Sequence, residues 1–220
     1  MSLSSYLSQF VEFISFPRPD DSPIVYLASL PDFDIHLIRS SVNRFLSREE
    51  VYRFNSYNQR SDQDRFVLSR FLIRSFLSAY LSQSISDVQI LLDAFGKPYS
   101  LAPIHFNISH SSEAILLSFH PSCPVGIDLE ANISYPNWQQ LATLVWDQSV
   151  VDHLKTQSFD SQPSYFLRCW CLYESIVKSF GTGFLKDLPP GYLSSIRSWE
   201  LNLCPDHFGF VTIDRSRFTK

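Results

Sequence analysis

Two acids two positions apart give the first indication of chemistry in this chain. Asp128 and Glu130 interrupt the otherwise apolar residues 125–130, which read VGIDLE. Side chains alternate between the two faces of a strand, so both carboxylates would share one face. In an apolar setting the two charges repel each other unless a cation lies between them. A hard divalent ion such as Mg²⁺, which takes oxygen ligands and retains waters, would satisfy this pair.

Basic and hydroxyl groups lie just upstream of the acids. A Gly-Lys-Pro turn carries the ammonium of Lys97, and Ser109 and His110 follow the apolar residues 104–108. These groups suit the phosphates of a metal-bound substrate, so residues 95–130 are interpreted as a phosphate-handling site. The alternative is structural, with the acids on a solvated strand face and His110 as a turn histidine whose hydrogen bonds are satisfied.

A predicted helix at residues 164–180 adds a further acid and a further base. Trp170, Glu174 and Lys178 follow one another at intervals of four, which places them on one stripe of the helix. The surrounding positions are strongly apolar, so this carboxylate and ammonium are expected at the edge of the core. A third metal ligand and a phosphate-binding cation could lie there. Alternatively, Glu174 and Lys178 form an ordinary helix pair worth roughly 0.2–0.5 kcal/mol.

Arginines upstream are the next candidates for phosphate contacts. The strongest predicted helix covers residues 62–82, and Arg65 lies in its first turn, where a cation opposes the helix dipole. Phosphate binding beside a helix N-terminus would explain this position, and a solvated surface arginine explains it equally well. Arg53 lies on a short helix opened by a capping box at residues 47–50.

The elements that must position these groups are those of an α+β protein with two comparable halves. Residues 1–16 could form a short helix or a covering arm, and a loop follows. Besides the segments already named, the patterns predict strands at residues 24–30, 88–93, 104–109 and 114–120, helices at 34–46, 137–146 and 149–155, a second capping box at 61–64, and a closing hairpin at 198–203 and 207–213. We place the division between residues 1–122 and 123–220. Neither a GxGxxG nor a Walker A loop is present.

Composition narrows the class of protein. The net charge of −4 argues against a nucleic-acid partner, so any cationic site must be local. The four cysteines lack paired CxxC spacing, which favours buried free thiols over zinc ligation and suits a reducing compartment. The N-terminus lacks the pattern of a signal peptide and no apolar run reaches membrane-spanning length. We therefore expect a cytoplasmic protein with no membrane partner.

Four motifs together resemble one family. The stretches FGKP, FNISH, VGIDLE and WCLYESIVKSFGTG, in this order and spacing, are similar to those of the 4'-phosphopantetheinyl transferases of the larger, surfactin-synthetase-activating type. The similarity covers residues 47–183. Each motif alone is weak, because such short patterns arise often by chance. The resemblance implies two pseudo-symmetric halves built of helices and antiparallel sheets, with coenzyme A bound in the cleft between them.

The resemblance also implies a role for each candidate residue. The acids that would hold Mg²⁺ against the pyrophosphate are Asp128, Glu130 and Glu174, and Glu174 is also the candidate base, directly or through a metal-bound water. The residues that would bind coenzyme A are Arg53, Arg65, Lys97, Pro98, Ser109, His110 and Lys178. Within this set His110 would reach the 3'-phosphate and Lys178 the pyrophosphate.

The implied activity is transfer of 4'-phosphopantetheine from coenzyme A to a serine of an acyl or peptidyl carrier protein, with release of 3',5'-ADP, by a monomer. Two alternatives remain open: a Mg²⁺-dependent phosphodiester hydrolase, and a non-catalytic relative that only binds carrier proteins. One departure from the family pattern is Tyr173, which stands where the family usually has lysine. We expect Tyr173 at the rim of the cleft, where it would tune affinity.

Overall fold

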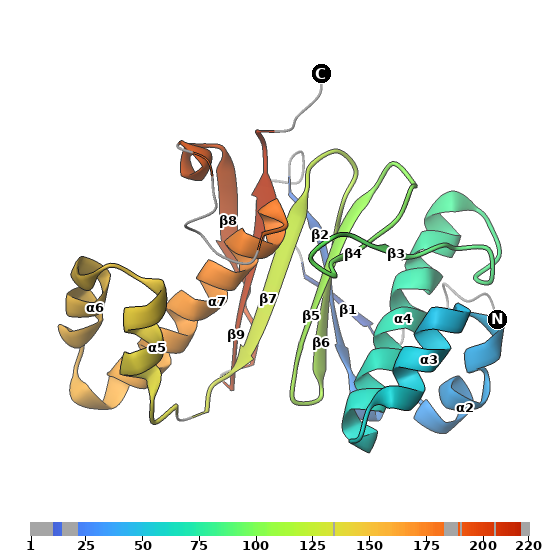
Figure 1. Ribbon diagram of the computed structural model, residues 1–220, viewed down its shortest axis with the longest axis horizontal. Helices are drawn as coiled ribbons and strands as arrows, with labels where there is room; N and C mark the ends of the chain where they lie inside the picture. Colours follow the sequence, from blue (N-terminus) through green and yellow to red (C-terminus); the bar gives the residue numbers. More distant parts are fainter. Residues whose placement is uncertain are drawn as a thin grey trace.

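The computed structural model describes residues 11–14, 22–133, 135–182, 189, 191–204 and 206–216. Figure 1 shows two sheets side by side, with one group of helices on the right and a second group on the left. We call β1 to β6 with their helices the N-terminal half, and β7 to β9 with theirs the C-terminal half. This arrangement of helices and antiparallel sheets confirms the predicted α+β class.

The N-terminal half is built on a four-stranded antiparallel sheet in the order β1-β2-β6-β5. Its strands are β1 (Val11–Ile14), β2 (Ile24–Ser29), β5 (His105–Ser111) and β6 (Ala114–His120). A small separate ladder pairs β3 (Leu91–Leu92) with β4 (Pro98–Tyr99). The helices are α2 (Ile35–Ser40), α3 (Arg48–Ser56) and α4 (Arg60–Leu81), with short 3-10 turns at Leu30–Asp32 and Val42–Arg44.

Helix α4 organises the core of this half. Val67, Leu68 and Ile73 on its inner face are completely buried, because apolar residues recur there at helical spacing. Helix α3 begins with the predicted capping box, in which the Ser47 hydroxyl accepts from the Glu50 amide and the Glu50 carboxylate accepts from the Ser47 amide. This cap fixes the residue at which α3 begins, and with it the position of Arg53 along the helix.

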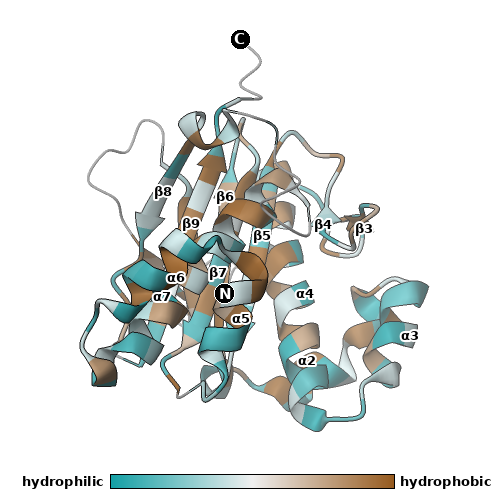
Figure 2. Ribbon diagram, turned by 60° about the vertical axis from the view of Figure 1, so that its left-hand side comes forward, coloured by the Kyte–Doolittle hydropathy of each residue, from teal (hydrophilic) through white to brown (hydrophobic). Residues whose placement is uncertain are grey.

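The C-terminal half has a three-stranded sheet in the order β7-β9-β8. Its elements are β7 (Val125–Ala131), α5 (Trp138–Val145), α6 (Gln148–Lys155), α7 (Gln162–Phe180), β8 (Ile196–Glu200) and β9 (His207–Asp214), with 3-10 turns at Phe159–Ser161 and Tyr192–Ser194. Figure 2 shows hydrophilic residues over much of the outer helices α3 and α6. Helix α7 packs directly on β7 and β9.

Gly126 sets the distance between β7 and α7. A Cβ atom at this position would lie only 2.1 Å from the Ser175 carbonyl oxygen and 2.2 Å from the Ser179 amide nitrogen. Any side chain would therefore push the helix away from the strand. This close approach brings the acids of β7 and the charged stripe of α7 to the same place.

Side chains rather than backbone pairing join the two sheets. Strands β5 and β7 are the facing edges of their sheets and lie side by side. The Asn107 carbonyl oxygen Oδ1 accepts from the amide of Ile127 at 2.9 Å, and the Ser111 hydroxyl accepts from the amide of Ala131 at 2.9 Å. We call this contact the seam. It holds β7 in register with β5.

Several predicted elements differ in extent from the structure. The helix predicted at 34–46 ends at Ser40 and gives way to a 3-10 turn, and the strand predicted at 88–93 is reduced to Leu91–Leu92. The second capping box is wrong: α4 begins two residues earlier, with Gln59 as N-cap and no side-chain cap. Asp64, the acid of that predicted box, instead pairs with Arg39 of α2 and with Arg60.

Other sequence predictions meet the described residues only in part. Of the first sixteen residues only Val11–Ile14 are described, and they form a strand rather than a helix. All four cysteines are free, as predicted, but only Cys123 and Cys171 are buried, whereas Cys169 is half-buried and Cys204 is exposed. The closing hairpin is confirmed as β8 and β9. Every helix in the described part of the chain is too short or too polar to cross a bilayer.

Candidate active site

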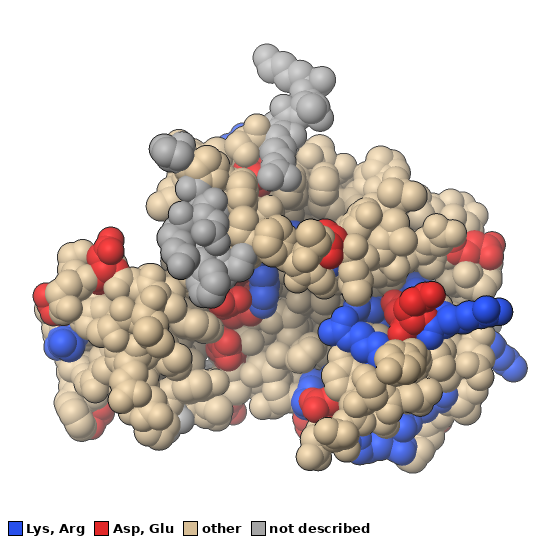
Figure 3. All heavy atoms as spheres, in the orientation of Figure 1, with Lys and Arg blue, Asp and Glu red and all other residues tan. Residues whose placement is uncertain are grey.

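A cleft of about 430 Å³ lies between the two halves. Its walls include every predicted site residue except Lys97: Arg53, Arg65, Pro98, Ser109, His110, Asp128, Glu130, Glu174 and Lys178. Figure 3 shows a hollow near the middle of the molecule, with acidic atoms and a basic group on its left side and basic groups on its right. The cleft therefore brings together groups from β5, β7, α3, α4 and α7.

Asp128 is the centre of the acidic wall, which also includes Glu130 and Glu174. Its side chain is almost fully buried, and its Oδ1 lies 2.5 Å from the Lys178 ammonium and 3.0 Å from the Ser109 hydroxyl, which donates to it. Its Oδ2 is buried without a hydrogen-bond partner among the described residues. Both acids line the cleft from one face of β7, as predicted, together with Trp170, Glu174 and Lys178 of the α7 stripe.

The charges of this wall shift one another's protonation. Burial, and then repulsion from Asp128, raises the pKa of Glu130 to about 7, although the Lys178 ammonium acts in the opposite direction. Burial also raises the pKa of Glu174, again with Asp128 adding to the shift. Loss of hydration lowers the pKa of the Lys178 ammonium, but the attraction of Asp128 and Glu174 outweighs it, so that this pKa is raised overall. The wall carries more negative charge than Lys178 neutralises.

The donor set of this wall fits a hard divalent cation. Asp128 has an unused buried oxygen, and burial together with repulsion from Asp128 raises the pKa of Glu130. Carboxylate oxygens are the ligands that Mg²⁺ prefers. No three His, Cys, Asp or Glu side chains of the described residues are already gathered as a metal-binding cluster. A cation here would therefore need some adjustment of Glu130 or Glu174 toward Asp128.

The facing wall is basic, and we define it by Arg53, Arg65, Arg70 and His110. Arg53 lies in the last turn of α3 and donates from Nε to the Tyr57 hydroxyl at 3.2 Å. Arg65 binds Asp62 and donates to the Ser112 carbonyl oxygen at 3.1 Å. The His110 ring is exposed to the cleft, but partial desolvation between the walls and the nearby Arg65 charge lower its pKa. All four groups can donate hydrogen bonds to an anion.

Lys97 is placed differently from the other predicted residues. Its ammonium donates to the carbonyl oxygens of Val125, at 3.1 Å, and Lys178, at 2.5 Å. These carbonyls belong to the start of β7 and the last turn of α7. Lys97 thus ties the Gly-Lys-Pro turn to the C-terminal half, while its neighbours Gly96 and Pro98 line the cleft.

Tyr173 does not lie at the rim of the cleft, contrary to expectation. Only 4% of it is exposed, and its ring stacks on Trp170 at 5.7 Å and meets Trp146 edge-on at 5.9 Å. It lies one position from Glu174, and successive helical residues point in different directions. Tyr173 therefore supports Trp170 from behind. Trp170 lines the cleft, and its indole favours the charged form of Glu130.

Sequence reasoning assigned no site role to Ser69 and Arg70 of α4. Ser69 and Arg70 are both buried, yet both border the cleft. An arginine in the middle of an apolar helix face was the available signal, because such a charge needs a partner. That partner, Glu50, lies on another helix and was not evident from the sequence.

Two family models match consecutive parts of the chain. Residues 39–122 match the N-terminal model of 4'-phosphopantetheinyl transferases, and residues 124–218 match the model of the 4'-phosphopantetheinyl transferase superfamily. Together they account for most of the described residues. The two models meet in the loop between β6 and β7.

Curated proteins give consistent similarities. The 4'-phosphopantetheinyl transferase Sfp of Bacillus subtilis is 30% identical over 141 residues, which are 63% of this chain and 62% of that protein. The 4'-phosphopantetheinyl transferase gsp of Aneurinibacillus migulanus is 32% identical over 138 residues, 63% of this chain and 57% of that protein. HetI of Nostoc is 26% identical over 176 residues, 73% and 74% of the two chains. The chain thus spans about three fifths of the length of the first two relatives.

Proposed function

This chain belongs to the 4'-phosphopantetheinyl transferase superfamily, and we propose that it transfers the 4'-phosphopantetheine group of coenzyme A to a serine of an acyl or peptidyl carrier protein. The reaction converts the apo carrier to the holo form and releases 3',5'-ADP. The observation that carries the proposal is the cleft in which an acidic wall faces a basic wall. The acidic wall could hold a cation that binds a pyrophosphate, and the basic wall could bind a separate phosphate monoester directly.

In the proposed reaction the serine oxygen forms a bond to the phosphorus that carries pantetheine, and the bond from that phosphorus to the bridging oxygen of 3',5'-ADP breaks. Glu174 accepts the serine proton, and its pKa, raised by burial, makes it a stronger base than an ordinary carboxylate. Lys178 offsets charge on the pyrophosphate from its place beside Asp128. His110, Arg53 and Arg65 hold the 3'-phosphate end of coenzyme A.

The metal proposal names Asp128, Glu130 and Glu174 as the ligands of Mg²⁺. When bound, the ion would neutralise pyrophosphate charge and orient it. Lys97 would act by fixing the Gly-Lys-Pro turn, whose neighbours Gly96 and Pro98 line the cleft. We further propose that residues 1–122 and 123–220 are the two functional halves, and that the protein acts in the cytoplasm as a monomer.

The decisive experiment mixes the protein with an apo acyl carrier protein, coenzyme A and Mg²⁺, and follows the carrier by mass spectrometry. The proposal predicts a phosphopantetheine adduct on the carrier and release of 3',5'-ADP. Hydrolysis of coenzyme A without an adduct would support the phosphodiester hydrolase instead. Carrier binding with neither product would indicate the non-catalytic relative. A Glu174→Gln variant is the control for contaminating activity.

A further inference from the structure

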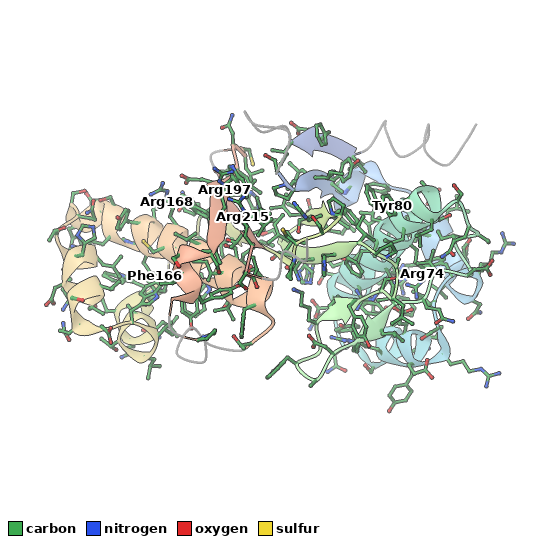
Figure 4. The ribbon with its side chains drawn as sticks, turned by 90° about the horizontal axis from the view of Figure 1, so that it is seen from above. Arg74, Tyr80, Phe166, Arg168, Arg197 and Arg215 are labelled. Atoms are coloured by element: carbon green, nitrogen blue, oxygen red, sulfur yellow. The ribbon has the colours of Figure 1, made fainter. Side chains whose placement is uncertain are left out.

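Helices α3 and α4 share a buried group of three charges, Glu50, Arg70 and Arg74, which we call the triad. The Glu50 carboxylate lies 3.0 Å from Nε of Arg70 and 2.5 Å from a terminal nitrogen of Arg74. Arg70 is 6% exposed and Arg74 is 2% exposed. Figure 4 shows Arg74 among the side chains of the N-terminal half, on the helical side. Two arginines thus converge on one carboxylate.

The triad carries one positive charge in excess. Among the described residues, no other carboxylate lies within 4 Å of either guanidinium. Burial, together with the positive charges of Arg53 and Arg74, lowers the pKa of Arg70, and Glu50 compensates only in part. A buried charge without full compensation is unfavourable. The N-terminal half therefore holds a site where an anion would relieve an existing imbalance.

The excess charge is turned toward the cleft. Arg70 borders the cleft and Arg74 does not. The guanidinium of Arg70 lies over the Phe66 ring at 4.9 Å, and that of Arg53 lies over the same ring at 5.7 Å. Phe66 itself lines the cleft, so both cations lie against one ring of its wall. An anion entering the cleft here would meet both.

A second observation at the same place also points to a ligand. Ser69, next to Arg70, is 4% exposed, borders the cleft, and has a buried hydroxyl without a hydrogen-bond partner among the described residues. A buried hydroxyl is normally satisfied. Ser69 follows Arg65 by one helical turn, so the two lie on the same face of α4. Arg65 in turn is close enough to His110 to lower its pKa.

We propose that Ser69 and Arg70 form a phosphate-binding subsite on the basic wall, with Glu50 as the residue that positions Arg70. The occupant is a phosphate monoester dianion, which accepts from the Ser69 hydroxyl and the Arg70 guanidinium and supplies the negative charge that the triad lacks. The assignment of this group to the 3'-phosphate of coenzyme A rests on the proposed function. The subsite is therefore where the ligand and the packing of α3 on α4 are coupled.

The test compares 3',5'-ADP with 5'-AMP, which lacks the 3'-phosphate, by isothermal titration calorimetry without metal. Ser69→Ala should weaken 3',5'-ADP about tenfold and leave 5'-AMP unchanged, as expected for one hydrogen bond to a charged group. The matched control is Ser75→Ala on the same helix. Ser75 also has a buried hydroxyl with no partner among the described residues, but it does not line the cleft. This variant should bind both nucleotides as the parent does.

A second pair of variants tests the guanidinium. Arg70→Gln and Arg74→Gln each leave Glu50 paired with one arginine, so circular dichroism and thermal melting should report similar folds. Only Arg70→Gln removes the group that borders the cleft, and it should weaken 3',5'-ADP on the order of 10- to 100-fold. Arg74→Gln should cost a few-fold at most, because the contact remains. If one variant fails to fold, Arg70→Lys against Arg74→Lys gives the same comparison with the charge retained.

The outcomes separate the subsite from the proposed function. Equal losses for 3',5'-ADP and 5'-AMP in Ser69→Ala and Arg70→Gln, or no loss in either, would overturn the subsite. A selective loss of 3',5'-ADP would support it. If the parent protein then failed to modify any apo carrier, the transferase proposal would fall while the phosphate subsite stood. If the parent protein modified carriers but the Ser69 and Arg70 variants bound 3',5'-ADP as the parent does, the transferase proposal would stand and the subsite would fall.

Discussion

Replacing Glu130 by glutamine should make the metal-free protein more stable at neutral and alkaline pH. Burial and the charge of Asp128 raise the pKa of Glu130 to about 7 from an ordinary value of 4.5. In the folded protein this carboxyl therefore holds its proton more tightly than in the unfolded chain. The stability that it contributes is complete below pH 4.5 and is lost as the pH rises through about 7.

The size of the effect follows from that shift. The difference between 7 and 4.5 is 2.5 units, and at about 1.36 kcal/mol for each unit this corresponds to about 3 kcal/mol. The side chain is only partly buried, so solvent screening reduces the figure to roughly 2 kcal/mol. The free energy of unfolding of the parent should thus fall by about 2 kcal/mol more than that of Glu130→Gln between pH 4.5 and 8.

The assay is urea unfolding in EDTA at several pH values between 4.5 and 8. Glu200→Gln is the control, because hydrogen bonding from Arg168 lowers the pKa of Glu200. Any stability from Glu200 is present at high pH and lost in acid, the opposite dependence. Glu200→Gln should therefore show the same fall in the free energy of unfolding between pH 4.5 and 8 as the parent. Adding Mg²⁺ at pH 8 should stabilise the parent more than Glu130→Gln. Parallel curves for the parent and Glu130→Gln would refute the account of a charge-strained acidic wall.

Three further predictions concern activity and packing. Glu174→Gln should fold normally and lose roughly 10²–10⁴-fold in transfer rate, measured by carrier modification at saturating coenzyme A; recovery by added Mg²⁺ alone would limit Glu174 to metal binding. His110→Ala should weaken coenzyme A about 10- to 100-fold and 3'-dephospho-coenzyme A hardly at all, by calorimetry; equal losses would remove it from the phosphate site. Gly126→Ala should lower the free energy of unfolding by about 1–3 kcal/mol or more, because its Cβ meets the backbone of α7; an unchanged urea midpoint would contradict this.

Much of the candidate site follows from local periodicity. Asp128 and Glu130 share a strand face because strand side chains alternate, and Glu174 and Lys178 share a helix stripe because they lie four residues apart. The Ser47 capping box was predictable for the same reason, since its partners are close in sequence. Features whose residues lie close together in the sequence can be predicted from spacing alone.

The features that escaped prediction depend on distant partners. Asp64, the acid of the predicted second capping box, is instead paired with Arg39 of α2, 25 residues away in the chain. Tyr173 packs in the core against Trp146, the residue that follows α5, and this contact cannot be predicted from the sequence around Tyr173. The excess charge at Arg70 exists only because α3 brings a single carboxylate, Glu50, to two arginines. Spacing predicts which face of a helix or strand a residue occupies, but it does not predict which residues of other elements pack against that face.

The seam between the halves has a consequence for folding and solubility. Strands β5 and β7 are the edge strands of their own sheets, and each covers the other through the hydrogen bonds of Asn107 and Ser111. An uncovered edge strand is a template for pairing with other chains. Either half expressed alone would present such an edge to its neighbours, so each half acts as the other's protection against aggregation. Unfolding of one half would therefore leave the edge strand of the other half uncovered. This coupling favours unfolding of the two halves as a single cooperative unit.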